Sequence, residues 1–144
     1  MDKKDEKIIE ALKENARLST QKIAKKTRIP ITTVHHRIKK LEKEGVIDTY
    51  TVTLNKKKIG LNVSAYILVT IDYNTLKQQN LTQEQIAKKI QAMDGVTEAA
   101  VVVGGTDIVL RVYATDITAL KTFVIETLRN IDAVKETQTM VVLE

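Results

Sequence analysis

Cysteine and tryptophan are absent from this chain of 144 residues, which also has only one phenylalanine and one proline. Without cysteine the chain can form no disulfide and no thiolate metal site, and it has no cysteine nucleophile. No apolar run reaches the roughly 20 residues that a membrane-spanning helix needs. The first 15 residues are charged and helical in pattern, unlike a signal peptide. We therefore expect a cytoplasmic protein without a membrane partner.

Histidine is nearly absent as well, because the chain has only His35 and His36. Adjacent residues on a helix point about 100° apart, so these two side chains cannot converge on one metal ion. We expect no metal and no cofactor. No segment assembles a nucleophile, a base and an orienting group, so an enzyme ranks far below a binding protein.

Positive charge, by contrast, is abundant in the amino-terminal part of the chain. Residues 1–60 contain 16 lysines and arginines against 8 acids, whereas residues 61–144 contain 7 against 10. A basic segment attracts the phosphate backbone of nucleic acids through counterion release. The charge division therefore predicts two domains, the first of which binds double-stranded DNA.

The basic segment has the pattern of three short amphipathic helices. The first is expected from about Asp2 or Asp5 to Asn15, the second after a cap at Ser19, and the third up to a stop at Gly45. Their shared core is predicted from the apolar spacing at Ile8, Ile9, Leu12, Ala16, Ile23, Ala24, Ile29, Val34, Ile38 and Leu41. Residues 1–47 are thus predicted to form a three-helix, winged type of helix-turn-helix domain.

The third helix has a polar face opposite its buried stripe. Within about one third of its circumference the spacing gathers hydrogen-bonding and cationic side chains, with one more lysine at the flank. An arginine can donate two hydrogen bonds to a guanine, and threonine or histidine can contact base edges or phosphates. A solvated face is the alternative, but the preceding helix and the basic charge favour DNA contact. The predicted DNA-binding residues are Thr32, Thr33, His36, Arg37 and Lys40, with Lys39 at the flank, while His35 is expected to pack at the domain edge.

A linker is predicted over residues 48–61. Residues 49–54 alternate threonine with apolar residues, as in a hinge strand. Lys56, Lys57 and Lys58 follow, and they either touch phosphates or simply solvate the linker.

Residues 62–144 have the pattern of two βαβ halves. Strands are predicted at 63–73, 96–103, 108–114 and 135–144, with helices after Thr82 and Asp116. This order gives a ferredoxin-like βαββαβ sandwich, so the fold class is α+β. The sheet face without helices is partly apolar, which predicts a homodimer formed by two sheets packing together.

The whole chain resembles the Lrp/AsnC family of prokaryotic transcription regulators. The resemblance rests on three segments in the family's order and spacing: DEKIIEALKENARLS, IAKKTRIPITTVHHRIKKLEKEGVIDTYTVTLNKKKIG and VVVGGTDIVLRVYATD. It implies dimers that assemble into octamers and a small effector, commonly an amino acid, bound near the hairpin loop. That position falls here on Gly104, Gly105, Thr106 and Asp107, with Thr137, Gln138 and Thr139 as neighbours.

The hairpin loop supports two interpretations. Glycine and aspartate serve tight turns whatever the function of the loop. Alternatively, exposed backbone amides receive an α-carboxylate while Asp107 binds an α-amino group.

The sequence departs from the family pattern at the turn of the helix-turn-helix. Arg28 stands where the family has glycine, and Pro30 where it has a serine cap. If the turn needs a left-handed residue, arginine costs about 1 kcal/mol there. Pro30 is expected to begin the third helix, since its missing N–H is not needed there.

These features predict a sequence-specific DNA-binding transcription regulator, dimeric or higher and modulated by a small effector. The alternative is an architectural protein that coats DNA with low sequence specificity.

Overall fold

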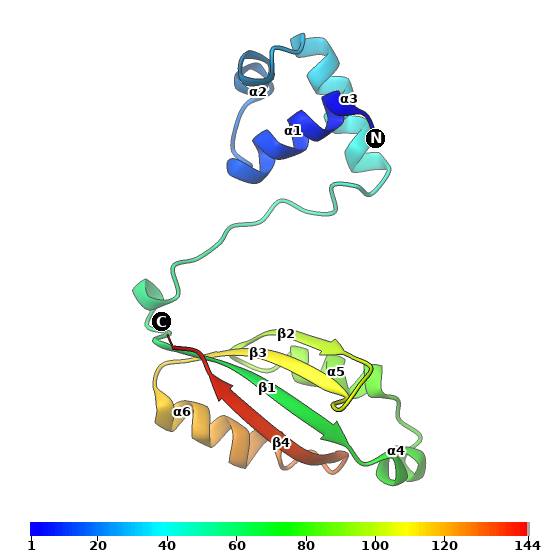
Figure 1. The fold of residues 1–144 in the computed structure, drawn as a ribbon, viewed down its shortest axis with the longest axis vertical. Helices are drawn as coiled ribbons and strands as arrows, with labels where there is room; N and C mark the ends of the chain where they lie inside the picture. Colours follow the sequence, from blue (N-terminus) through cyan, green and yellow to red (C-terminus); the bar gives the residue numbers. More distant parts are fainter. Residues whose placement is uncertain (144) are drawn as a thin grey trace. The chain divides into compact units, whose positions relative to one another are not determined.

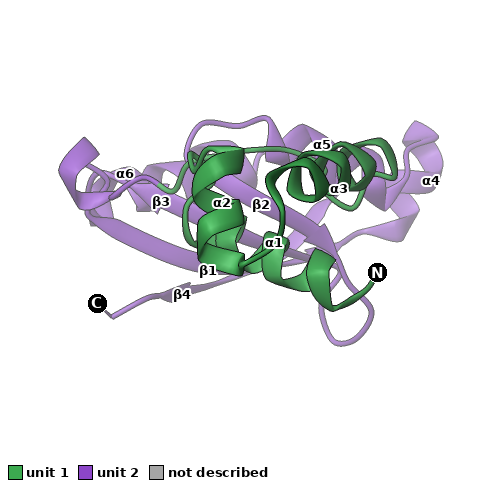
Figure 2. Ribbon diagram, turned by 90° about the horizontal axis from the view of Figure 1, so that it is seen from above, with its two compact units in different colours: residues 1–53 green, residues 54–144 purple. Residues whose placement is uncertain are grey.

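The computed structural model describes residues 1–143 (Figure 1). The chain divides into two compact units, residues 1–53 and residues 54–144 (Figure 2). Among the described residues, no helix is long and apolar enough to cross a membrane. Unit 1 contains three helices and no strand, α1 (Lys3–Glu14), α2 (Thr20–Thr27) and α3 (Ile31–Lys43).

Unit 1 folds around the apolar stripes that the sequence predicts. Ser19 caps α2, since its side chain accepts a hydrogen bond from the Lys22 amide. The α3 residues Val34 and Leu41 are buried, while Ile38 is half-buried. The predicted core is therefore confirmed in its main members, which are Ile8, Ile23, Ile29, Val34 and Leu41.

The turn between α2 and α3 passes through a left-handed residue. Arg28 has φ 57° and ψ 36°, and the Ile29 amide reaches back to the Ala24 carbonyl at 3.3 Å. Pro30 has φ −54° and ψ 138°, and its carbonyl accepts a hydrogen bond from the Val34 amide. The strained arginine is confirmed. Pro30 occupies the cap position rather than the first helical residue, because its ψ is extended.

Arg28→Gly should stabilise unit 1. Glycine adopts a positive φ without the Cβ clash, which returns up to about 1 kcal/mol, although the more flexible unfolded chain offsets part of it. Urea unfolding followed by circular dichroism would measure the gain. Thr27→Gly is the matched control, because Thr27 is helical and glycine there should destabilise. A loss of stability in Arg28→Gly would contradict the strain.

The linker differs from its prediction. Residues 48–55 belong to no helix or sheet, and the short 3₁₀ helix η1 (Lys57–Ile59) follows them. The alternating pattern at 49–54 therefore does not form a strand in a single chain. A strand is stabilised by a hydrogen-bonded neighbour, and no backbone hydrogen bond joins this segment to another strand in the described residues.

Unit 2 contains a four-stranded antiparallel sheet in the order β2-β3-β1-β4. Its strands are β1 (Val63–Ile71), β2 (Val96–Val101), β3 (Ile108–Ala114) and β4 (Val134–Val141). Helices α5 (Gln83–Gln91) and α6 (Ile117–Thr122) make the two crossovers, and α6 continues as one π-helical segment, η2 (Phe123–Leu128). This is the predicted ferredoxin-like topology. Helix α4 (Tyr73–Gln79) was not predicted.

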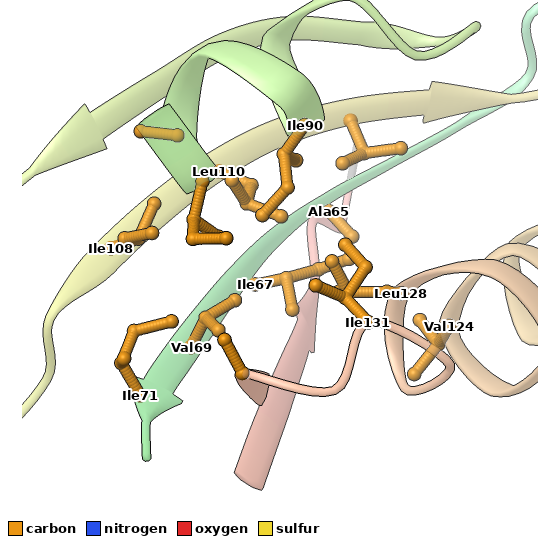
Figure 3. Close-up of a cluster of buried hydrophobic side chains, with 14 of the residues drawn as sticks. Ala65, Ile67, Val69, Ile71, Ile90, Ile108, Leu110, Val124, Leu128 and Ile131 are labelled. Atoms are coloured by element: carbon orange, nitrogen blue, oxygen red, sulfur yellow. The ribbon is translucent and has the colours of Figure 1, made fainter. Parts of the chain in front are cut away.

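One face of the sheet forms the core of unit 2. The β1 residues Ala65, Ile67 and Val69 are fully buried there. They pack with Ile90 of α5 and Leu128 of η2 (Figure 3). Both helices therefore cover the same face, as predicted, and the opposite face carries the intervening residues of each strand.

Candidate nucleic-acid interface and effector loop

The predicted DNA-binding side chains lie on α3 opposite its buried stripe. Thr32, His36, Lys39 and Lys40 are exposed, while Thr33 and Arg37 are half-buried. Helix α3 has no side-chain cap and three cations from Arg37 to Lys40. The rings of His35 and His36 meet edge to face at 5.9 Å. The arrangement leaves hydrogen-bonding and cationic groups on an accessible helical surface.

Arg37 has partners that its position on the polar face did not suggest. Its Nη1 donates to Oδ2 of Asp2 at 2.6 Å and to Oδ1 of Asp5 at 2.8 Å. The same two aspartates form the capping box of α1. The Asp5 amide and then the Arg37 guanidinium lower the pKa of Asp2 to about 2. The Asp2 amide, followed by Arg37, also lowers the pKa of Asp5.

Lys40 and Lys56 each make one weak side-chain contact within their own unit. Lys40 lies 3.7 Å from Glu44, an exposed pair one helical turn away. Such a pair restrains a lysine little, so Lys40 can turn toward a phosphate. Lys56 lies over the ring of Tyr113 in unit 2, with its Nζ at 5.0 Å from the ring centroid.

The hairpin loop between β2 and β3 is fixed by Asp107. Its Oδ2 accepts the Ile71 amide at 2.8 Å, and its Oδ1 accepts the Tyr73 hydroxyl at 2.5 Å and the Gln83 side-chain amide at 3.1 Å. The neighbouring Thr106 hydroxyl donates to the Val69 carbonyl. Sequence reasoning missed both donors: it assigned Tyr73 to the end of the first strand rather than to α4, and it did not connect Gln83, in the predicted helix after Thr82, with Asp107. The Asp107 carboxylate raises the pKa of Tyr73.

The loop glycines stand apart from this network. Gly104 has φ +149°, and no atom lies within 4 Å of where a Cβ would be at either Gly104 or Gly105. The loop backbone is therefore accessible, as a ligand site requires.

The three predicted neighbours on β4 separate across the sheet. Thr137 pairs with Val69 and Thr139 with Ile67, while Gln138, opposite Leu68, belongs to the other face. Thr137 accepts a hydrogen bond from Arg129 at 3.0 Å, and Thr139 lines a shallow apolar hollow beside α6. Thr137 is the one of the three that lies closest to the loop. It is paired with Val69, and the carbonyl of Val69 accepts a hydrogen bond from the loop residue Thr106.

A helix-turn-helix unit joined to a ferredoxin-like unit defines a two-domain DNA-binding regulator. Residues 1–48 match the family described as winged helix-turn-helix DNA-binding, and residues 64–144 match the Lrp/AsnC ligand binding domain. The chain belongs to the Lrp/AsnC family and is a DNA-binding transcriptional regulator.

Relatives and solved structures agree with this assignment. The chain is 40% identical to an uncharacterised HTH-type transcriptional regulator of Pyrococcus furiosus, over 98% of this chain and 91% of the relative. It is 30% identical to the regulatory protein AsnC of Escherichia coli, over 100% and 91%. A Neisseria meningitidis transcriptional regulator in complex with L-Met superposes with a TM-score of 0.90 at 28% identity, covering 100% of this chain and 90% of that one. The Escherichia coli AsnC structure gives 0.86 at 28% identity, covering 100% and 93%.

Proposed function

We propose that this regulator recognises a specific operator by placing α3 in the major groove. The observation that carries the proposal is the row of exposed hydrogen-bonding and cationic side chains on α3 above buried Val34 and Leu41. A helix that buries one stripe and exposes such a row can present donors to base edges. The proposed contacts are Thr32, Thr33, His36, Arg37, Lys39 and Lys40. The protein would act in the cytoplasm, on the prokaryotic chromosome.

A competition binding assay tests sequence specificity. Labelled duplex from the promoter region of the regulator's own gene is bound, and unlabelled promoter or unrelated duplex of equal length is added. We expect the promoter to compete at least about a hundredfold better, within the usual range for specific binding. Equal competition by both duplexes would favour the architectural, DNA-coating alternative.

We propose further that two chains pair through the open face of the sheet. Tyr66 and Met140 lie side by side on this face at 41% and 43% exposure. Arg111 lies over the rings of Tyr66 and Tyr113, at 4.4 Å and 5.2 Å from their centroids. A large, partly apolar face of this kind is typical of an interface between subunits. Such a dimer would present two α3 helices to a two-fold operator, and its assembly into an octamer is part of the same proposal.

Leu68→Glu should break the dimer. Leu68 lies on the open face between Val109 and Gln138, and a carboxylate there would be buried without a partner in the interface. Sedimentation velocity should show the mass falling to that of one chain. Gln91→Glu adds the same charge on exposed α5 and should leave the mass unchanged. An unchanged mass for Leu68→Glu would contradict the interface.

We also propose that an amino acid binds at the hairpin loop and modulates the regulator. The accessible backbone at Gly104 and Gly105 supports this, as does the L-Met complex of the Neisseria meningitidis protein. Both Asp107 oxygens already accept hydrogen bonds, so an α-amino group would join or displace the donors from Tyr73 and Gln83. A thermal-shift screen of free amino acids tests the proposal. A ligand near 100 times its Kd should raise Tm by several degrees, whereas no shift from any amino acid would contradict it.

A further inference from the structure

The acidic amino terminus of α1 meets the middle of α3 at Arg37. The two ends of this contact are 32 residues apart in the sequence. Asp5 is 10% exposed and Arg37 27% exposed at the side chain, so the pair is largely shielded from water. An acidic pair directly beside a proposed DNA-contact residue needs an explanation, since carboxylates repel phosphates.

Both oxygens of Asp5 are committed in the fold. One accepts Nη1 of Arg37 at 2.8 Å, and the other accepts the Asp2 backbone amide at 3.0 Å. Asp2 in turn accepts the amides of Lys4 and Asp5. The carboxylate that receives Arg37 is therefore held in place by a helix cap, which is itself part of the backbone geometry of α1.

Arg37 uses only one of its nitrogens in this contact. A guanidinium has five N–H donors, and Nη1 carries two of them. No hydrogen bond from Nε or Nη2 to another described residue is formed. The side chain also borders a shallow hollow together with His36 and Lys40, two other proposed DNA contacts, and with Asp2 and Asp5. One edge of the guanidinium is thus fixed while donors remain for a ligand.

We propose that Asp5, assisted by Asp2, is a positioning residue for DNA recognition. It holds Arg37 in one conformation, so that the remaining donors of Arg37 meet the DNA without first losing rotamer freedom. The proposal rests on the proposed DNA contact by α3. It assigns a binding role to acids that would otherwise only oppose DNA.

The direction in which Asp5→Asn changes the operator affinity distinguishes a positioning role of Asp5 from simple repulsion of phosphates. Asp5→Asn removes the charge that holds Arg37, yet the asparagine carbonyl can still accept the Asp2 amide and keep the cap. If Asp5 only repels phosphates, the variant binds the operator more tightly. If Asp5 positions Arg37, the variant binds more weakly, by at least about threefold. Glu10→Gln is the control, because Glu10 is an exposed acid of α1 outside the cluster and its loss should leave affinity equal or slightly higher.

A double-mutant cycle on the full chain identifies the route of the effect. Asp5→Asn should weaken operator binding in the wild-type background, whereas in the Arg37→Ala background it should leave the affinity equal or slightly higher, because only the repulsion of phosphate by Asp5 is then removed. Urea unfolding confirms that every variant is folded. The slope of log affinity against log salt should stay unchanged in Asp5→Asn, since no cation is removed. Tighter binding by Asp5→Asn, or equal weakening in both backgrounds, would overturn the positioning role. Lys40→Ala tests the α3 contact independently, and an unchanged affinity there would count against the proposed function instead.

Discussion

Arg37→Ala should weaken operator binding by tenfold to a hundredfold. The variant loses the donors that Arg37 offers to DNA, and a good contact of this kind contributes about that factor. It also leaves Asp2 and Asp5 without the cation that both contact at 2.6 and 2.8 Å. Two unneutralised carboxylates would then lie beside the DNA-binding face. Fluorescence anisotropy with a labelled operator at fixed ionic strength measures the loss.

The control for Arg37→Ala must remove one positive charge without touching α3. Lys121→Ala does so, because Lys121 is an exposed residue of α6 in unit 2. Its affinity for the operator should stay within about twofold of wild type, since Lys121 belongs to unit 2, which carries none of the proposed DNA contacts, and salt screens the effect of exposed charges on distant groups. Arg37→Lys should recover part of the lost affinity, because an ammonium keeps the charge but not the fork geometry. Wild-type affinity in Arg37→Ala would remove Arg37 from the proposed interface.

The fold of both units could be predicted because each element has its own repeating pattern. Val34 and Leu41 on α3, and Ile67 and Val69 on β1, are buried at the positions that helical and strand periodicity require. Periodicity reports which side of an element faces the core. Periodicity can be read without knowing which element packs against that side, so a single sequence is sufficient to predict the buried side of each helix and strand.

The partners of polar groups could not be predicted in the same way. The sequence places Arg37 on the polar face of α3, but the aspartates that bind it belong to the start of α1, 35 and 32 residues earlier in the chain. A charged side chain has many possible partners, and the three-dimensional contact selects among them. Likewise, the contacts to Asp107 come from two different helices, Tyr73 from α4 and Gln83 from α5. Helix α4 has only Leu76 as a buried residue and thus a weak sequence pattern. The Asp72 cap was the available signal for α4, since its side chain accepts the Asn74 amide.

Gly95→Ala should destabilise unit 2 by at least about 2 kcal/mol. Gly95 has φ +81°, where an L-residue costs about 1 kcal/mol or more. An added Cβ would also lie 2.5 Å from the backbone carbonyl oxygen of Tyr113, a distance at which the strand has to move. That movement would strain the hydrogen bond from the Tyr113 amide to the Gly95 carbonyl, which is 2.8 Å long.

The hairpin glycine supplies the matched control for this prediction. Gly105→Ala meets no atom within 4 Å, and its φ is not positive, so its stability should change by no more than about 0.5 kcal/mol. Urea unfolding of both variants measures the difference in their free energies of unfolding, provided that the dependence of this free energy on urea concentration has the same slope in both. Gly95 precedes β2 in unit 2, and the proposed DNA contacts lie on α3 in unit 1. Under conditions in which Gly95→Ala is fully folded, its operator affinity should therefore equal that of the wild type as long as the variant still forms the dimer. Equal stability of the two variants would mean that the chain relaxes around Gly95, and the close approach to Tyr113 would then not constrain the sheet.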